Sequence, residues 1–392
     1  MVFVGVDIAK TNHVACAVNE TGEKLTNPFP FKNTEEGFER LIAWLEGVAE
    51  SPEGAFVAME ATGHYWMACF TYLNAHDYRV CVVNPIQVKA MRELKGFSRV
   101  KSDPVDSWLI AETLRLGDID ETKLATDDIQ ALRSLTRYHQ ALKQETACVK
   151  IQLTCVMDSY FPEYAGVFSD MFGAASMAVL KKSALPHELS RAHTSALGKK
   201  ITEASHGRLG AEKAAQVKAA AKRSVGIQLG QDAAAFQIKT MVSQIEFLNS
   251  TCAKVEAKVK TLLMRIEPLI LTVPGISVAT GAQIVAEVGD VRRFNNAAAI
   301  VKYAGLNPGV SQSGQFEAKG SPITKKGSPY LRRALWLAAN QMRRFDPKMR
   351  AYYDKLRDEG KCHRVAVTAC ARKLCHVVFA VMRDQVPYDP GR

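Results

Sequence analysis

Four acidic residues stand at places where one fold could gather them. Asp7 ends the apolar run Val-Phe-Val-Gly-Val-Asp, and Glu60 ends the run Ala-Phe-Val-Ala-Met-Glu. Asp103 and Asp106 stand three residues apart in Lys-Ser-Asp-Pro-Val-Asp, where a helix is predicted to begin. Carboxylates are costly to bury unless a cation compensates their charge. A fold that brings these acids together therefore needs a cation among them.

The N-terminal part of the chain predicts a mixed β-sheet covered by helices. Apolar, β-prone runs predict strands at residues 2–6, 13–18, about 25–31, 55–60 and 78–84. Apolar residues at helical spacing predict one helix after Thr34, its N-cap, and another at about 64–75. Three strands followed by alternating helix and strand favour a mixed sheet. Asp7 and Glu60 would lie on neighbouring strands of that sheet.

Asp103 is predicted to be the N-cap of a helix, with Pro104 at the first helical position. A spacing of three puts Asp103 and Asp106 on the same side of the first turn. For this pair alone, capping and the helix dipole explain the acids as well as a metal does. Adding Asp7 and Glu60 favours a metal, because hard divalent ions prefer carboxylate oxygens.

One or two such ions could serve phosphodiester chemistry, by activating a nucleophile and stabilising the leaving oxygen. The strand order and the four acids resemble the RuvC-like, RNase H-type nuclease domain with a DEDD set of acids.

Positive charge is concentrated in the last quarter of the chain. The 392 residues are 47% hydrophobic, which is enough for two or three domains with real cores. The net charge is +11, and residues 301–392 hold 18 Lys and Arg against 7 Asp and Glu. Such a surplus is expected of a surface that meets phosphates, although a solubilising surface has a similar composition.

The nine cysteines are predicted to be reduced core residues. None forms a Cys-x-x-Cys pair, and the dipeptides Cys362-His363 and Cys375-His376 match no usual zinc spacing. We expect neither a disulfide framework nor a zinc site. The beginning of the chain is strand-like and no run of 18 apolar residues follows, so we expect a cytoplasmic protein.

Two long helices are predicted at residues 127–158 and 232–266, which lack glycine and proline. The stretch 160–231 between them, rich in Ala, Lys, Ser and Gly, is predicted to be less regular. Long helices of this kind form either an antiparallel pair within the chain or a coiled coil between chains. Both alternatives are compatible with a dimerising arm.

Two C-terminal segments could contact nucleic acid. The turn Pro274-Gly275-Ile276 leads into a helix whose first amides could hold a phosphate, and it resembles the second half of a helix-hairpin-helix. A tight turn between packed helices would have the same sequence. Further on, a glycine-broken loop holds two serines and is followed by four cations: Ser311, Ser313, Lys325, Lys326, Arg332 and Arg333. A serine among cations could attack a phosphate, although Ser-Gly in a loop more often has only a structural role.

Taken together, these segments resemble the bridge-RNA-guided transposases of insertion-sequence family 110 over nearly the full length. The resemblance rests on the DEDD acids, the Pro-Gly-Ile turn, and the elements Gly-Leu-x-Pro, Ser-Gly, Lys-x-Gly and Leu-Arg. It implies a RuvC-like α/β nuclease domain at 1–125 and a helical coiled-coil dimerisation region at 126–266. It also implies a mainly α transposase domain at 267–392, with a helix-hairpin-helix-like element and a basic surface.

The resemblance assigns roles to single residues. Asp7, Glu60, Asp103 and Asp106 would be catalytic and would bind Mg²⁺ or Mn²⁺. Ser313 would be the nucleophile. Members of the family often have adjacent serines before the glycine, whereas Gln312 here separates Ser311 from Ser313, and we favour Ser313. Further nucleic-acid contacts would come from Gly275, Ser311, Lys325, Lys326, Arg332 and Arg333.

The implied activity is excision and insertion of a mobile element by serine attack on a DNA phosphate. A phosphoserine intermediate keeps the phosphodiester energy, so strands can be rejoined without ATP. The partners would be donor and target double-stranded DNA, a structured guide RNA and further copies of the chain, as dimers or tetramers, near the bacterial or archaeal nucleoid. Two alternatives stay open: a Holliday-junction-type endonuclease that uses metal-activated water, and a non-catalytic nucleic-acid-binding protein.

Overall fold

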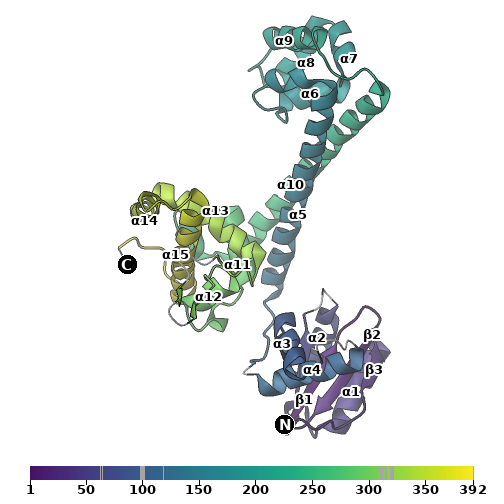
Figure 1. The fold of residues 1–392 in the computed structure, drawn as a ribbon, viewed down its shortest axis with the longest axis vertical. Helices are drawn as coiled ribbons and strands as arrows, with labels where there is room; N and C mark the ends of the chain where they lie inside the picture. The colour runs from purple at the N-terminus through teal and green to yellow at the C-terminus, as the bar shows by residue number, and fades with distance from the viewer. Residues whose placement is uncertain are drawn as a thin grey trace. The chain divides into compact units, whose positions relative to one another are not determined.

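The computed structural model describes all residues except 62, 64, 98–101, 118, 310, 311, 314, 315, 318–321 and 392, and for residues 312, 313, 316 and 317 it describes the backbone alone. The chain divides into two compact units (Figure 1). Unit 1 comprises Met1–Leu124 and unit 2 comprises Ala125–Arg392.

Unit 1 contains a five-stranded sheet of order β3-β2-β1-β4-β5. Its strands are β1 (Val2–Asp7), β2 (Asn12–Val18), β3 (Phe29–Lys32), β4 (Ala55–Glu60) and β5 (Arg79–Val83). β1, β2 and β3 pair in antiparallel fashion, whereas β4 is parallel to both β1 and β5. The predicted mixed sheet is therefore confirmed, with Asp7 and Glu60 on neighbouring strands.

Helices cover both faces of this sheet. They are α1 (Glu35–Val48), α2 (Trp66–Ala75), α3 (Pro85–Leu94) and α4 (Asp103–Leu116), together with a short 3₁₀ turn at Pro52–Gly54. Val4 and Met59 pack against α1 and α2 on one face, and Ala58 packs against α4 on the other. Thr34 caps α1 as predicted, because its hydroxyl accepts the Gly37 amide at 3.2 Å.

Gly5 lets α4 cross β1 at very close range. A Cβ at this position would lie 2.1 Å from the Ser107 carbonyl oxygen and 2.3 Å from the Ala111 nitrogen. Real Cβ contacts are never so short, so only glycine fits beneath the helix. This contact fixes the position of α4 along β1.

The predicted N-cap of α4 is wrong by one residue. The helix already includes Asp103, and the preceding Ser102 has the extended backbone of an N-cap, with φ −156°. The Ser102 carbonyl accepts the amides of Val105 and Asp106 at 2.9 Å. Pro104 fits the second helical position as well as the first. The amides of both positions lack an intrahelical acceptor, so the missing N–H of proline removes no hydrogen bond. Asp103 therefore lies in the first turn, together with Asp106.

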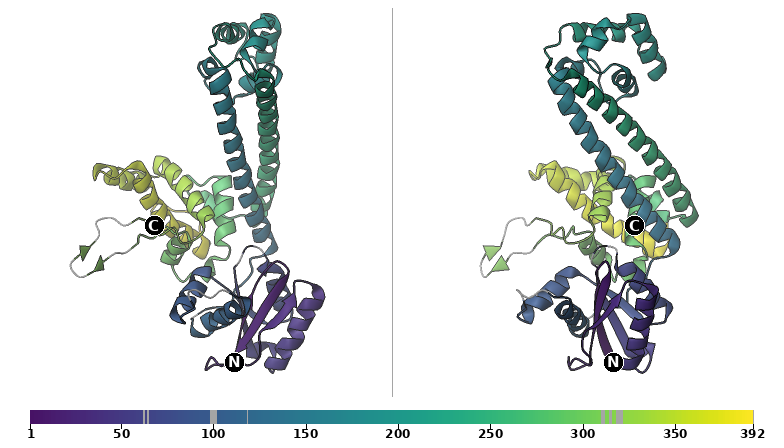
Figure 2. Two further views of the ribbon diagram at one scale, coloured as in Figure 1. Left: turned by 45° about the vertical axis from the view of Figure 1, so that its right-hand side comes forward. Right: turned by 90° about the vertical axis from the view of Figure 1, so that its right-hand side faces the viewer.

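Unit 2 is built around two long helices, α5 (Asp127–Tyr160) and α10 (Gln231–Ile266). They lie side by side along their length (Figures 1 and 2). Arg265 pairs with Asp128 at 2.6 Å at one end, and His139 contacts Glu256 at 2.8 Å further along, so the two helices are antiparallel. The predicted helices are confirmed, and within the chain they form the antiparallel pair.

The prediction of a less regular stretch at 160–231 is wrong. It contains α6 (Ala174–Lys182), α7 (Pro186–Arg191), α8 (Thr194–Ala204) and α9 (Ala211–Lys222), with a 3₁₀ turn at Pro162–Gly166. The helices are short, with 6 to 12 residues each, and α6 and α9 are rich in alanine, so the local sequence pattern covers few turns. They are nevertheless held by buried residues, among them Leu180, Leu189, Ile201 and Val217.

The rest of unit 2 is mainly helical. It contains α11 (Val278–Val288), α12 (Ala297–Tyr303), α13 (Pro329–Phe345), α14 (Pro347–Asp358) and α15 (His363–Asp384), with 3₁₀ turns at Leu269–Thr272 and Val291–Arg293. Two short strands, β6 (Gln312–Ser313) and β7 (Phe316–Glu317), pair with each other.

Among the described residues, α15 is the one helix long and apolar enough to cross a membrane. Val367, Leu374 and Val378 on this helix are fully buried, and α15 packs against α12, α13 and α14. The apolar composition of α15 is therefore explained by its position in the core of the C-terminal helices.

Candidate functional site

Asp7 and Glu60 lie at the same edge of the sheet. The parallel pairing of β1 and β4 matches Val6 with Met59, and Asp7 and Glu60 each follow as the last residue of their strand. Successive side chains of a strand point to opposite faces. Asp7 therefore shares a face with Gly5, and Glu60 shares it with Ala58, which is the face that α4 covers.

The first turn of α4 lies at this same edge. Ser107 crosses over Gly5, and at the other end of the helix Arg115 donates to the Glu20 carbonyl at 3.2 Å. Glu20 follows β2, whose Val18 pairs with Phe3 near the start of β1. The helix thus runs opposite to β1, and its first turn lies toward the end of the strand. The structure therefore brings Asp7, Glu60, Asp103 and Asp106 to one corner of unit 1.

Asp106 already has a cationic partner. Arg92, in the last turn of α3, donates through Nη2 to Oδ1 of Asp106. The side chains of Arg92 and Asp106 are only 18% and 11% exposed. Asp103, in contrast, is exposed. The two acids of α4 therefore have different surroundings although they share a turn.

Four carboxylates at one corner are a donor set that fits a hard divalent cation. Over the described part of the chain, no group of three or more His, Cys, Asp or Glu side chains is close enough to hold a metal. The acids fit a cation in chemistry and in their place on the fold, and the side chains would have to close around it.

The third acid of α4 was missed in the sequence. Glu112 is 1% exposed, and it accepts Arg115 Nε at 2.6 Å and a hydrogen bond from Lys95. Burial opposes its ionisation, yet the hydrogen bonds from Arg115 and Lys95 lower its pKa below the ordinary value. Its position within the apolar run Leu-Ile-Ala-Glu-Thr-Leu could have indicated a buried charge.

In unit 2, the backbone of Ser313 lies in β6 and pairs with Phe316 of β7. Ser311 and Gly314 lie outside the described residues. The loop that carries these strands is closed at its base, where Pro308 pairs with Ile323 and the Thr324 amide donates to the Asn307 carbonyl at 2.9 Å.

The four predicted cations behind this loop differ in their surroundings. Lys325, Lys326 and Arg333 are exposed. Arg332 is half-buried and donates to the Ala304 carbonyl at 2.9 Å, and burial lowers its pKa. Arg332 therefore holds the chain at the base of the loop.

Glu287 on α11 is fully buried and was not singled out in the sequence. It accepts two hydrogen bonds from Arg137 of α5, at 2.7 and 2.9 Å, and one from the Ser328 hydroxyl at 2.8 Å. Ser328 caps α13 through the Leu331 amide. The hydrogen bond to Glu287 raises the pKa of Arg137. This cluster ties Ser328, which follows the loop that carries Ser313, to α5 and α11.

The Pro-Gly-Ile turn packs on α13. Gly275 has φ +87°, and a Cβ there would lie 2.3 Å from the Met342 nitrogen. Ser277 caps α11 and accepts the Thr280 amide at 3.3 Å. These contacts explain the glycine by close packing, while phosphate binding at Gly275 stays a prediction.

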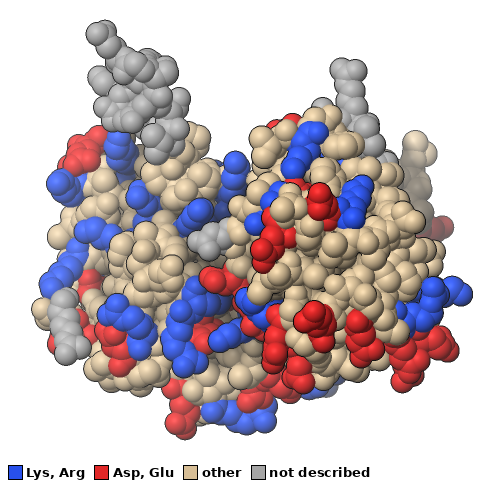
Figure 3. Space-filling model, turned by 90° about the horizontal axis from the view of Figure 1, so that it is seen from below, with Lys and Arg blue, Asp and Glu red and all other residues tan. Residues whose placement is uncertain are grey.

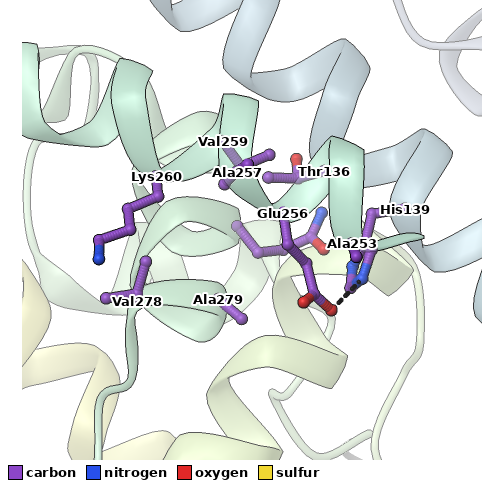
Figure 4. A pocket seen from close by; sticks show the side chains of 10 residues that line it. Thr136, His139, Ala253, Glu256, Ala257, Val259, Lys260, Val278 and Ala279 are labelled. Carbon is purple, nitrogen blue, oxygen red and sulfur yellow. Dashed lines mark hydrogen bonds and ion pairs between the residues drawn. The ribbon is translucent and has the colours of Figure 1, made fainter. Parts of the chain in front are cut away.

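A separate cavity of about 440 Å³ lies among α5, α10 and α11 (Figure 4). Its wall is mostly apolar and includes Val259 and Ala279. Glu256, paired with His139, and Lys260 also line it. None of the predicted site residues lines this cavity.

The two units carry opposite net charge. Unit 1 has 12 Lys and Arg against 18 Asp and Glu, whereas unit 2 has 39 against 22. On the face drawn in Figure 3, basic side chains are numerous on the left and acidic side chains gather on the right. Unit 2 is therefore the better match for a polyanion.

Two family comparisons match separate parts of the chain. Residues 4–162 match a DEDD family of IS110 described as "Transposase". Residues 267–354 match the "Transposase IS116/IS110/IS902 family". The first match contains all four acids, and the second contains Ser313 and the cations that follow it.

Several bacterial proteins are similar along nearly their whole length. An "Insertion element IS110 uncharacterized 43.6 kDa protein" of Streptomyces coelicolor is 24% identical, over 99% of this chain and 95% of its own. A "Pilin gene-inverting protein" of Moraxella bovis is 23% identical, over 99% and 97%. Among solved structures, Thermus thermophilus RuvC is 20% identical, covers 31% of this chain and all of its own, and has a TM-score of 0.24.

Proposed function

The chain belongs to the IS110 family of transposases, and we propose that it cleaves and rejoins DNA through a serine nucleophile assisted by a divalent cation. The nucleophile is Ser313. The cation ligands are Asp7, Glu60, Asp103 and Asp106. The observation that supports the proposal is where the four acids stand on the fold: Asp7 and Glu60 end the paired strands β1 and β4, and Asp103 and Asp106 lie in the first turn of α4, which covers that sheet face.

The acids are well suited to this role because regular elements carry them. Asp7 and Glu60 belong to paired strands, and α4 is held on β1 by the close contact at Gly5. Ligands on such elements keep their spacing better than ligands on loops. A bound Mg²⁺ or Mn²⁺ would stabilise the charge that develops on the phosphate and on the leaving oxygen.

Ser313 forms the covalent link. Its Oγ bonds to the DNA phosphorus and loses its proton, while the bond from phosphorus to one sugar oxygen breaks and that oxygen is protonated. The reverse reaction with another strand's hydroxyl rejoins DNA and frees the serine, so no ATP is needed. The exposed Lys325, Lys326 and Arg333 lie close to Ser313 in sequence and would screen the phosphate charge.

The remaining parts of the proposal rest on the resemblance to the family. Residues 1–125 supply the acids, 126–266 the helical arm for dimerisation, and 267–392 the serine and the basic DNA surface, with Gly275, Ser311 and Arg332 as further contacts. Serine from one subunit and acids from another would act together in a dimer or tetramer. A structured guide RNA selects donor and target DNA by base pairing. The enzyme would work in the cytoplasm, at the nucleoid.

A covalent-trapping assay tests the proposal. Purified protein is incubated with Mg²⁺, the RNA encoded beside its gene and labelled junction DNA, and run on a denaturing gel. We expect a protein–DNA adduct that is lost in Ser313→Ala and Asp7→Ala. Ser311→Ala is the matched control and should keep the adduct. An adduct that persists in Ser313→Ala would contradict the assignment of the nucleophile.

A second candidate is a structure-specific endonuclease that uses metal-activated water. It is favoured by one observation, that all four acids belong to a single compact unit without Ser313. This candidate predicts cleavage without an adduct, lost in Asp7→Ala and kept in Ser313→Ala.

A further inference from the structure

We infer that Arg92 is a built-in competitor of the divalent cation, which holds Asp106 until the cation displaces it. Arg92 belongs neither to the four predicted cation ligands nor to the residues predicted to contact nucleic acid. The inference rests on the proposed function of the four acids. It makes Arg92 a positioning residue that sets how tightly the site binds its cation.

The first step is the contact itself. The Arg92 guanidinium donates to an Asp106 carboxylate oxygen, and both side chains are more than four-fifths buried. A buried ion pair is costly to break when one partner is simply removed, because the other charge stays behind without compensation. Asp106 is therefore held in an ordered and compensated state before any cation arrives.

The second step is that Arg92 and a divalent cation oppose each other. Both are positive and both would contact the same carboxylate, so their mutual repulsion is strong in a partly buried site. A carboxylate that accepts a guanidinium hydrogen bond is also a weaker ligand. Binding of the cation at Asp106 must therefore weaken or break the contact with Arg92.

The third step is that Arg92 can leave without its helix. The segment after α3 has a second link to α4, because Lys95 donates to Glu112, which also binds Arg115. Val88 of α3 packs in the same cluster as Leu109 and Ile110 of α4. Release of Asp106 is therefore a movement of one side chain, while the packing of α3 on α4 persists.

Calorimetric titration of the full-length protein with Mg²⁺ and with Mn²⁺ tests the inference. We expect Arg92→Gln to bind the cation at least about tenfold more tightly than the wild type, since a hydrogen bond to a charged group is worth this factor or more. Arg92→Lys keeps a cation beside Asp106 and should stay near the wild-type affinity. Lys95→Gln is the matched control, because it cuts the other link between α3 and α4, and it should also bind as the wild type does.

Thermal unfolding gives a second readout that does not depend on activity. Without cation, Arg92→Gln should unfold at a lower temperature than the wild type, because Asp106 is left uncompensated. Added Mg²⁺ should raise the unfolding temperature of Arg92→Gln by more than it raises that of the wild type. Lys95→Gln should lose stability by the same amount with and without Mg²⁺.

The outcomes separate the inference from the proposed function. Equal or weaker cation binding by Arg92→Gln, with saturable binding by the wild type that Asp106→Asn lowers, would overturn the role of Arg92 alone. Absence of saturable binding in the wild type and in Arg92→Gln would overturn the cation site and, with it, this inference.

Discussion

The two units hold their buried charges in different ways. In unit 1, Asp106 and Glu112 are neutralised by Arg92, Lys95 and Arg115, which lie within 20 residues in the chain. In unit 2, Glu287 is neutralised by Arg137, which is 150 residues away. Unit 1 therefore stabilises its acids locally, beside the proposed cation site. Unit 2 uses one buried acid to join segments that are distant in sequence.

The units also differ in how they present their proposed reactive groups. Asp7 ends a six-residue strand that has a neighbour on each side. Ser313 belongs to a two-residue strand that pairs with a single short partner. The difference suggests a division of work, in which a rigid sheet positions the charge-stabilising acids and a loop delivers the nucleophile.

The largest effect is expected where α4 crosses the sheet. Gly5→Val should cost unit 1 about 3 kcal/mol or more, because the new side chain would enter the backbone of α4 at Ser107. Urea unfolding followed by circular dichroism measures the loss. Gly47→Ala is the control, since a Cβ at Gly47 meets nothing within 4 Å, and it should be neutral or slightly stabilising. Equal stability of Gly5→Val and the wild type would contradict the described crossing.

The next effect concerns the long-range acid of unit 2. Glu287→Ala should destabilise the protein by about 2–3 kcal/mol, because Arg137 and Ser328 lose their buried acceptor together. Glu256→Ala removes an acid that is about half exposed in its ion pair, and should cost less than about 1 kcal/mol. Urea unfolding of both variants tests this contrast, and similar losses would remove the distinction between the two acids.

A smaller effect should appear as a dependence on pH. The folded-state pKa of Glu112 is lowered, so this carboxylate stabilises the fold above its unfolded pKa, near 4.5, and the stabilisation is lost as the pH falls through the folded value. The stability advantage of the wild type over Glu112→Gln should therefore be constant above about pH 5 and shrink below 4.5. Chemical unfolding between pH 3 and about 6 measures it. A stability difference that stays constant over this pH range would contradict a folded-state pKa of Glu112 below its unfolded value.

The smallest effect tests the charge contrast between the units. Lys326→Ala should weaken binding to duplex DNA a few-fold and lower the salt slope by about 1, as loss of one phosphate contact does. Lys89→Ala, an exposed lysine of unit 1, should leave binding unchanged. Fluorescence anisotropy over a range of salt concentrations gives both quantities. An equal loss in the two variants would mean that both units contact DNA.

Much of the fold could be predicted because its periodicity is strong. The apolar runs that end in Asp7 and Glu60 gave strands with correct neighbours, and the glycine-free segments gave α5 and α10. The helices between Tyr160 and Gln231 were not predicted because each has at most 12 residues, which is too short for a local pattern to define it. Their helical state depends on packing in three dimensions, which a local pattern does not contain.

The site was predictable only in part. The position of a residue at a strand end is a local property, so the gathering of Asp7 and Glu60 could be foreseen. The partners of buried charges are not local properties. Nothing near Glu287 in the sequence indicates Arg137, and nothing in the spacing of Arg92 and Asp106 indicates an ion pair between two helices.

The antiparallel pair of α5 and α10 has a consequence for how such chains can vary. The chain enters α5 near Asp128 and comes to the end of α10 near Arg265, and these two residues are joined by an ion pair. Adding a whole turn to both helices would lengthen the arm by about 5.4 Å and leave its base unchanged. The pair of α5 and α10 is thus a spacer of adjustable length. Related transposases could change this length without changing the C-terminal region that contains Ser313.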